Sequence, residues 1–326
     1  MRRINLVTWN NGRGLKRDIQ ILSRILHDAG HRIDVNGLSV PYFQHNFYPH
    51  HFPYRLVTRC LAGRRPAYDV NLFLEYVVPE WLDRARVNYL IPNQEWFRDE
   101  YHPYLPDFEL VLCKTKFAQH VFERLGCRRE FISFTSYDRL SEGHDKSYRS
   151  FFHLAGSSLH KGTRAVVEVW RRHPEWPPLT IVQSPRHARQ VAAANINYIV
   201  GRLKDAALRR HQNVHGIHVC PSEAERFGHS IVEAMSCRSV AITTDAPPMN
   251  ELVSPERGVL AAYRSAESQR MGIMFYVDHC ALEQKVQEVL GLTQAAKNQL
   301  GDNAREWYLQ NHLYFRRRVV EVLSEV

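Results

Sequence analysis

The stretch PSEAERFGHSIVEA, residues 221–234, decides the fold that we expect for this chain. The apolar run before it, 216–220, predicts a strand, and the apolar spacing after residue 230 predicts a helix. The stretch is therefore the turn between a strand and the helix that follows it. Two carboxylates, Glu225 and Glu233, stand eight positions apart around this turn.

The turn itself consists of Phe227, Gly228, His229 and Ser230. A helix N-terminus carries N–H groups without helical partners and the positive end of the helix dipole, so this turn can hold a phosphate. Glu225 would lie on one side of that phosphate and Glu233 on the other. Since carboxylates accept hydrogen bonds from hydroxyl groups, the pattern suits a ligand with a central diphosphate, a sugar at one end and a ribose at the other.

Two other interpretations of these carboxylates are weaker. They could decorate a solvated helix face, but the turn residues between them argue against this. A glycoside hydrolase would need carboxyl groups about 5 to 9.5 Å apart. Eight residues along a helix span about 12 Å, which favours binding two ends of one ligand over flanking one bond.

The segment resembles the E-x7-E motif of retaining GT-B glycosyltransferases, specifically the GT4-like group, also called glycosyltransferase group 1. The resemblance rests on Pro221-Ser222, on Phe227-Gly228 and on Glu233-Ala234-Met235. It implies that Glu225 contacts the sugar of a nucleotide-diphosphate donor and that Glu233 binds the ribose hydroxyls. It also implies the GT-B fold, an α/β architecture in which two Rossmann-like domains with parallel sheets face a central cleft.

Strand-like and helix-like segments alternate along the whole chain, which predicts parallel sheets with crossover helices. We expect an acceptor domain at 1–139, a hinge in the polar stretch 138–150, a donor domain at 150–303 and a final helix at 304–326. By the resemblance, that helix crosses back to the first domain, although a solvated face accounts equally well for Arg316-Arg317-Arg318. The expected strands are 4–8, 32–38, 69–76, 87–91, 110–113, 131–134, 151–155, 179–182, 196–200, 217–220, 240–243 and 258–262.

Two further loops resemble the donor site of the family. The first strand ends in Trp9-Asn10-Asn11-Gly12-Arg13-Gly14, which is similar to the glycine-rich loop of GT-B enzymes. After the strand 151–155, Lys161 stands where the family carries a lysine that clamps the donor diphosphate, whereas Ser157 replaces the expected arginine. A hydroxyl lacks the charge of a guanidinium, and Arg13 is the candidate that could supply it. The plain alternative for Lys161, an exposed lysine at a helix start, is disfavoured by the helix dipole.

The stretch Asn93-Gln94-Glu95 follows the fourth strand, near the point where many relatives place a histidine close to the reacting sugar. These residues either orient the acceptor or donor sugar or only cap the next segment. We count Asn93, with Glu225 and Lys161, among the candidate catalytic residues. The resemblance implies a front-face reaction in which the leaving diphosphate helps to deprotonate the acceptor. No D-x-D occurs in the chain, so we expect neither a metal nor another cofactor.

The composition is that of a soluble globular protein, with 44% hydrophobic and 24% charged residues, and 326 residues suffice for two domains. No apolar run approaches the roughly 20 residues that span a bilayer. Six scattered cysteines show no metal-ligand spacing, so we expect a cytoplasmic protein and leave open peripheral contact with the inner face of the membrane. The net charge of +9 suits anionic ligands without selecting among sugar nucleotides, lipid-linked acceptors and nucleic acid.

The segment Tyr42–Tyr54 combines aromatic residues with His45, His50 and His51. A surface loop that packs its aromatics on the first domain is the plainer interpretation. The alternative is a loop that binds the acceptor or a membrane interface, and metal binding is poorly supported because no paired ligand spacing recurs nearby.

We therefore predict a retaining glycosyltransferase that moves a sugar from a nucleotide-diphosphate donor to a glycan, lipid-linked or other acceptor. A sugar-nucleotide epimerase or hydrolase on the same fold is an alternative, because fold does not determine function. A DNA-modifying glycosyltransferase is another, and a non-enzymatic nucleic-acid binder ranks last. The predicted donor site comprises Gly12, Arg13, Ser157, Lys161, Glu225, Phe227, Gly228, His229, Ser230 and Glu233.

Overall fold

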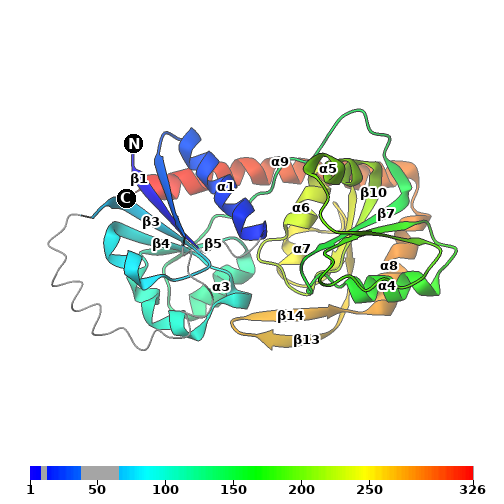
Figure 1. Cartoon of the computed structure of the whole chain (residues 1–326), viewed down its shortest axis with the longest axis horizontal. Helices are drawn as coiled ribbons and strands as arrows, with labels where there is room; N and C mark the ends of the chain where they lie inside the picture. Colours follow the sequence, from blue (N-terminus) through cyan, green and yellow to red (C-terminus); the bar gives the residue numbers. More distant parts are fainter. Residues whose placement is uncertain (9–12, 38–65, 326) are drawn as a thin grey trace. The chain divides into compact units, whose positions relative to one another are not determined.

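The computed structural model describes residues 1–8, 13–37 and 66–325, and the chain divides into two compact units. Unit 1 comprises Met1–Ser133 and Phe315–Val326, and unit 2 comprises Phe134–Tyr314. Figure 1 colours the chain from the N-terminus to the C-terminus. Among the described residues, no helix is both long enough and apolar enough to cross a membrane.

Within its described residues, unit 1 is built on a six-stranded parallel sheet with the order β2-β1-β3-β4-β5-β6. Its strands are β1 (Arg3–Thr8), β2 (Arg32–Gly37), β3 (Tyr68–Leu74), β4 (Ala85–Ile91), β5 (Leu110–Cys113) and β6 (Arg129–Phe131). Its helical segments are α1 (Arg13–Asp28), α3 (Lys116–Arg124) and the 3-10 turns η2 (Pro79–Arg84), η3 (Gln94–Trp96) and η4 (Asp99–Asp107). The strand predicted at 131–134 is present as β6 but lies earlier, at Arg129–Phe131, and it cannot extend through Ser133, whose φ of +58° is incompatible with extended backbone.

Asparagines form a ladder of hydrogen bonds across four strands of this sheet, and the two central ones, Asn5 and Asn71, are buried. Asn36 on β2 donates to Asn5 on β1 over 2.7 Å. Asn5 donates to Asn71 on β3, and Asn71 donates to Asn88 on β4, each over 2.9 Å. A slip by one residue would turn these amides to the other face and leave buried polar groups without partners. The ladder therefore favours the observed register of these parallel strands.

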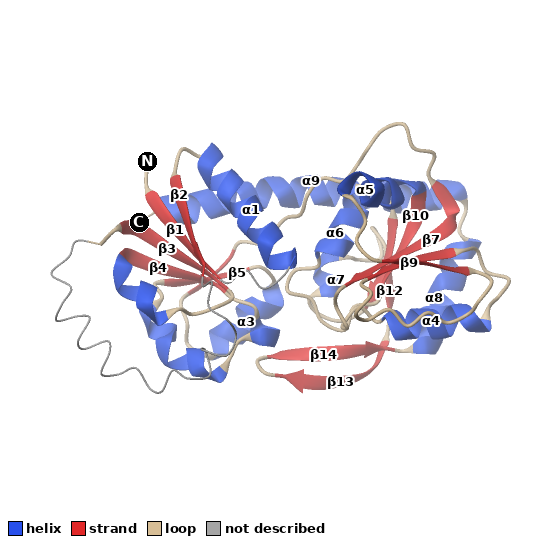
Figure 2. Cartoon of the chain, viewed as in Figure 1, coloured by secondary structure: helices blue, strands red, loops and turns tan. Residues whose placement is uncertain are grey.

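Unit 2, which is described throughout, contains a second six-stranded parallel sheet with the order β12-β11-β10-β7-β8-β9. Its strands are β7 (Ser147–Gly156), β8 (Leu179–Gln183), β9 (Ile196–Val200), β10 (His215–Cys220), β11 (Val240–Thr244) and β12 (Val259–Ala261). Its helices are α4 (Thr163–Arg172), α5 (Asp205–Val214), α6 (His229–Ser236), α7 (Met249–Leu252) and α8 (His279–Gly291). The antiparallel hairpin of β13 (Tyr263–Gln269) and β14 (Gly272–Val277), seen in Figure 2, was not predicted.

The order of the strands in unit 2 creates a switch point between β7 and β10. The chain starts at β7, builds β8 and β9 on one side, and returns to build β10, β11 and β12 on the other. The loops that follow β7 and β10 therefore leave the same edge of the sheet and diverge. Ligands of open α/β sheets bind at such a point, outside the carboxyl ends of the strands. Residues 157–162 and 221–228 form these two loops.

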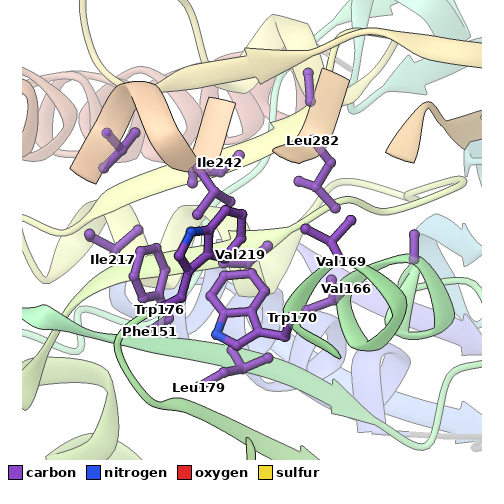
Figure 3. Close-up of a cluster of buried hydrophobic side chains, with 14 of the residues drawn as sticks. Phe151, Val166, Val169, Trp170, Trp176, Leu179, Ile217, Val219, Ile242 and Leu282 are labelled. Carbon is purple, nitrogen blue, oxygen red and sulfur yellow. The ribbon is translucent and has the colours of Figure 1, made fainter. Parts of the chain in front are cut away.

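A hydrophobic core fixes the elements on which the first of these loops depends (Figure 3). Val166, Val169 and Trp170 recur at helical spacing and give α4 one buried face. The indole ring of Trp170 lies 4.9 Å from the ring of Phe151 on β7 and 5.2 Å from that of Trp176, measured between centroids. Because β7 and α4 are both anchored in this core, the loop between them is held at each end.

The predicted hinge at 138–150 lies inside unit 2 rather than at the boundary, which falls at Ser133. The last helix, α9 (Gln294–Ser324), is the reason. Asn311 on α9 donates to the backbone oxygen of Phe134 over 2.7 Å, and Arg305 pairs with Asp138 over 2.6 Å. These contacts with α9 place the start of the segment after Ser133 in unit 2.

Helix α9 also begins earlier than the helix predicted at 304–326. Gly301 lies inside this helix, and a Cβ there would stand 2.3 Å from the backbone oxygen of Arg238, so the close approach requires glycine. The helix belongs to unit 2 up to Tyr314 and to unit 1 from Phe315. The arginine cluster is paired within unit 1, where Arg318 lies 3.0 Å from Glu130.

Candidate active site

The loops after β7 and β10 meet at Gly162 and Pro221. A Cβ added to Gly162 would stand 2.1 Å from the backbone oxygen of Pro221. Gly162 also has a φ of +64°, which side chains with a Cβ rarely adopt. Glycine is therefore what allows the two loops to approach so closely.

The ammonium group of Lys161 lies between Glu225 and Ser230. It pairs with Oε1 of Glu225 and donates to Oγ of Ser230 over 3.3 Å. The hydroxyl of Ser222 donates to the same Oε1 over 2.6 Å. The side chains of Lys161 and Glu225 are 17% and 9% exposed, so the pair is shielded but reachable. The structure thus brings together three of the predicted site residues.

Helix α6 begins beside this pair, at the predicted phosphate turn. Gly228 is its N-cap residue, and its φ of +110° and a Leu252 methyl only 2.5 Å from the position of a Cβ leave room for glycine alone. Phe227 is buried against Phe134, with ring centroids 5.6 Å apart. Since the first N–H groups of a helix have no helical partners, they add a positive field to the charge of Lys161. The arrangement can hold an anionic group such as a phosphate.

A buried histidine on β7 connects the strand ends from which the two loops leave. His153 on β7 contacts the backbone oxygen of Val219 through Nδ1 at 2.7 Å and Oγ1 of Thr163 through Nε2 at 2.9 Å. Because a carbonyl can only accept, Nδ1 carries the hydrogen and Nε2 accepts from the threonine hydroxyl. Burial lowers the pKa of His153 to about 4, so the ring is neutral. It therefore ties β7, the start of α4 and the end of β10 together.

Strand β11 fixes the other loop. Thr243 donates to the backbone oxygen of Cys220, and Thr244 donates to that of Ser222, each over 2.8 Å. Burial raises the pKa of Cys220 to about 12. Its thiol is therefore protonated at neutral pH and is no nucleophile, although it lies at the end of a strand that leads into the site.

The second carboxylate of the motif, Glu233, is 1% exposed. The hydroxyl of Ser136 donates to its Oε1 over 3.2 Å, and Gln212 donates to its Oε2 over 2.8 Å. Ser136 also contacts Nδ1 of His229 at 3.1 Å. A ribose hydroxyl would have to replace one of these partners to reach Glu233. Ser136 and Gln212 were not predicted, because they lie 97 and 21 positions from Glu233 and belong to no motif.

The remaining predicted residues belong to other parts of the chain. Asn93 lies in unit 1, where it is 1% exposed and precedes η3 as the N-cap residue. Ser157 is exposed in the loop after β7. Gly12 and the segment Tyr42–Tyr54 lie outside the described residues, as does the side chain of Arg13, with which α1 begins.

Unit 1 contains two further buried groups that the sequence did not signal. Glu75 directly follows β3, which neighbours β1 at the switch point of its sheet, and it is 5% exposed with a φ of +66°. Backbone strain of this kind gathers at functional sites. Lys114, directly after β5, pairs with Asp18 on α1 over 2.5 Å, and both side chains are almost fully buried. Within the described ranges, no group of three or more histidine, cysteine, aspartate or glutamate side chains could hold a metal ion.

Residues 186–307 match the family model described as glycosyl transferases group 1. The matched range contains both carboxylates of the motif, Glu225 and Glu233. This range is a group 1 glycosyltransferase domain. The glycosyltransferase class predicted from the motif is therefore confirmed. A search of curated proteins found no match to the sequence.

Solved structures share the fold of this glycosyltransferase over its whole length. A glycosyltransferase from Rickettsia africae is 13% identical, with a TM-score of 0.72 and coverage of 99% of this chain and 98% of the other. Sucrose-phosphate synthase from Thermosynechococcus elongatus is 14% identical, with a TM-score of 0.73 and coverage of 100% and 99%. The Anabaena protein HepE in complex with UDP-glucose is 14% identical, with a TM-score of 0.66 and full coverage of both chains. The GT-B fold is thereby confirmed.

Proposed function

We propose that this glycosyltransferase is a retaining, GT4-like enzyme that takes its sugar from a nucleoside diphosphate sugar. The observation that carries the proposal is the placement of Lys161 between Glu225 and Ser230, beside the N-terminus of α6. Lysine and helix N–H groups are phosphate ligands, and a carboxylate next to them accepts from sugar hydroxyls. The complex of HepE with UDP-glucose makes a uridine diphosphate sugar the first donor to test.

The two carboxylates would serve opposite ends of this donor. A diphosphate competes with Glu225 for Lys161, because both are anionic partners of the same ammonium group. Lys161 would turn toward the phosphate, and Glu225 would then accept hydroxyl groups of the sugar. Glu233 would bind the ribose after exchange with Ser136, whose contact at 3.2 Å is the longer of the two at that carboxylate.

The transfer that we propose needs no nucleophile from the protein. The bond between the anomeric carbon and the β-phosphate oxygen breaks while the acceptor oxygen forms a bond on the same face of the sugar. The proton of the acceptor hydroxyl passes to the departing phosphate oxygen, which leaves as part of the nucleoside diphosphate. Lys161 and the N–H groups of α6 stabilise the negative charge that develops there. Ser157 contributes only a neutral donor to this task.

Exchange of Glu225 for glutamine tests the proposal. Glu225→Gln keeps the size of the side chain and removes its charge, so the transfer rate should fall by about 100-fold while the Kd for the nucleoside diphosphate changes little. The measurement pairs transfer kinetics with calorimetric binding. Full kcat in the variant, or equal losses in rate and nucleotide affinity, would show that Glu225 does not serve the sugar.

We also propose that the reaction requires no divalent cation, since no D-x-D is available to clamp a metal on the diphosphate. Turnover should persist in excess EDTA. Complete loss of turnover that magnesium or manganese restores would contradict this part of the proposal.

The acceptor is proposed to be a glycan or a lipid-linked glycan, with Asn93 in unit 1 as the residue that orients it. Release of nucleoside diphosphate should depend on added acceptor, whereas an epimerase or hydrolase would consume the donor without one. The cysteines in the described part of the chain are free thiols, which suits a cytoplasmic enzyme. Cell fractionation tests this location and its extension to the inner face of the membrane.

A further inference from the structure

Glu223 joins three segments that are far apart in the sequence. Its N–H group donates to the backbone oxygen of His160 over 3.1 Å, and its carboxylate lies 3.3 Å from Nδ1 of the same histidine. Its backbone oxygen accepts from the N–H group of Phe275 over 2.7 Å. The loop after β7, the loop after β10 and strand β14 therefore meet at one residue.

The hairpin that contributes Phe275 has one exposed strand and one largely buried strand. Most of β13 is exposed to solvent, whereas Met274, Phe275 and Val277 of β14 are buried. Phe275 stands opposite Ala266 in the register of the hairpin, but its N–H group is used by Glu223 and not by β13. One edge of β14 thus forms hydrogen bonds with β13, and its other edge forms a hydrogen bond with the loop that leads to Glu225.

We propose that Glu223 is a positioning residue, which sets where Lys161 stands relative to Glu225 by tying both of their loops to the hairpin. The inference rests on the proposed function, because it assigns Glu223 a role in that same donor site. Glu223 itself does not contact Lys161 or Glu225 in any bond described above. It acts through His160, the neighbour of Lys161 in the chain, and through its own place two positions before Glu225.

The physical reason lies in the length of the lysine side chain. The lysine side chain has many rotamers, so the backbone that carries it must be held if its ammonium group is to meet a phosphate reproducibly. Displacement of a reacting group by about 1 Å can cost 100-fold in rate. Two contacts from Glu223 to His160 restrain that backbone, and the bond from Phe275 restrains Glu223 in turn.

The side-chain contact is tested with two variants of Glu223. Glu223→Ala removes the contact to His160 and should lower kcat by at least about 10-fold, with a smaller change in the Kd for UDP. Glu223→Gln retains an oxygen that accepts from the imidazole and should stay within about 3-fold of the wild type. His160→Ala should lower kcat as much as Glu223→Ala does, and the double variant should lower kcat no further than either single variant. Additive losses, or wild-type kcat in Glu223→Ala, would overturn the proposal.

The backbone contact is tested at Phe275. Phe275→Pro removes the N–H group that Glu223 uses, and proline is tolerated on a strand edge whose N–H is not part of the ladder. Phe275→Leu keeps the N–H group and removes the ring, so it controls for lost packing. Only the proline variant should slow transfer relative to the leucine control. Glu288→Gln, on the exposed face of α8, serves as the surface control. Equal kcat in the proline and leucine variants would contradict the role of the hairpin.

Hydrogen exchange separates this inference from the proposed function. In Glu223→Ala and Phe275→Pro, the backbone amides of 157–162 and 222–225 should exchange faster than in the wild type, whereas those of Glu223→Gln should exchange at the wild-type rate. Faster exchange in a protein that neither binds nor turns over nucleotide sugars would leave the positioning role standing and sink the proposed function. If the wild type transfers sugar but Glu223→Ala and Phe275→Pro change neither kcat nor amide exchange, the positioning role is wrong and the proposed function stands.

Discussion

Single carboxylates in this protein differ more in their partners than in their chemistry. Glu225 is held by Lys161, whose side chain is partly exposed, and by Ser222, which is buried. Glu233 is held by Ser136 and Gln212 and is almost fully buried. The same residue type is thus slightly exposed beside a lysine in one place and a buried hydrogen-bond acceptor in the other.

A pair of variants distinguishes these roles of Glu233. Glu233→Gln should weaken UDP binding by about 1 to 3 kcal/mol if the carboxylate accepts from ribose hydroxyls. Ser136→Ala removes the competing hydroxyl and should leave UDP affinity unchanged or raise it. Calorimetry with UDP measures both. Weaker binding in Ser136→Ala and unchanged binding in Glu233→Gln would show that Glu233 is only a structural anchor.

At the scale of secondary structure, the site depends on how one glycine begins a helix. Gly162 is the N-cap residue of α4 and offers no side chain to cap it. It is there because two loops must pass within contact distance, with the oxygen of Pro221 occupying the space of a Cβ. Helix α4 therefore lacks a side-chain cap at its N-terminus, and the loop of Lys161 can approach the loop of Glu225 closely.

Gly162→Ala should therefore reduce stability and activity together. A Cβ would meet the backbone oxygen of Pro221 at 2.1 Å, and the φ of +64° adds strain. We expect a loss of about 1 to 3 kcal/mol in the free energy of unfolding, since overpacking of this kind displaces backbone. Urea denaturation gives this quantity, and the transfer rate gives the effect on the site.

The matched control is Gly291→Ala in α8, where no atom lies within 4 Å of the added Cβ and φ is ordinary. Alanine should be neutral or stabilising there. If both substitutions have the same small effect, the close approach at Gly162 does not matter.

At the scale of the whole molecule, unit 2 holds histidines that folding keeps neutral. Burial lowers the pKa of His153 to about 4 and that of His218 to about 3. Both rings use their nitrogens internally, His153 as described above and His218 through a contact of Nε2 with the backbone oxygen of Gln212 at 3.2 Å. Protonation would break this pattern and place a charge in the core.

Unit 2 should accordingly lose stability in mild acid. An unfolded histidine binds a proton below a pH of about 6.5, whereas these folded histidines bind one only near pH 4 or below. Between those values the unfolded state holds more protons, so the free energy of unfolding falls as pH falls, by up to about 1.4 kcal/mol per pH unit and histidine. Urea unfolding at pH 7.5, 6 and 5 measures the slope. His218→Gln should flatten it and the exposed His120→Gln should not; equal slopes in both variants would refute the assignment.

The periodicity of the sequence predicted most of the strands, because parallel strands buried on both faces leave continuous apolar runs such as 217–220 and 240–243. It failed where the backbone turns for a local reason, as at Ser133, and where a hairpin of exposed residues carries no apolar signal, as at β13. The last helix was predicted to begin at residue 304, whereas α9 begins at Gln294, and the close approach of Gly301 to the backbone of Arg238 within it joins residues distant in sequence.

What the sequence determined by itself is local. The strand, turn and helix of 216–236 and the two carboxylates around the turn follow from residues that stand close together in the chain, and so does the enzyme class that they indicate. The tertiary structure decided the partners. Lys161 meets Glu225 across 64 positions because the adjacent parallel strands β7 and β10 bring the loops that follow them to one edge of the sheet. Ser136, in the segment before β7, meets Glu233 on α6 across 97 positions. Spacing along the chain records none of these contacts, since they depend on strand order and packing that only the folded chain possesses.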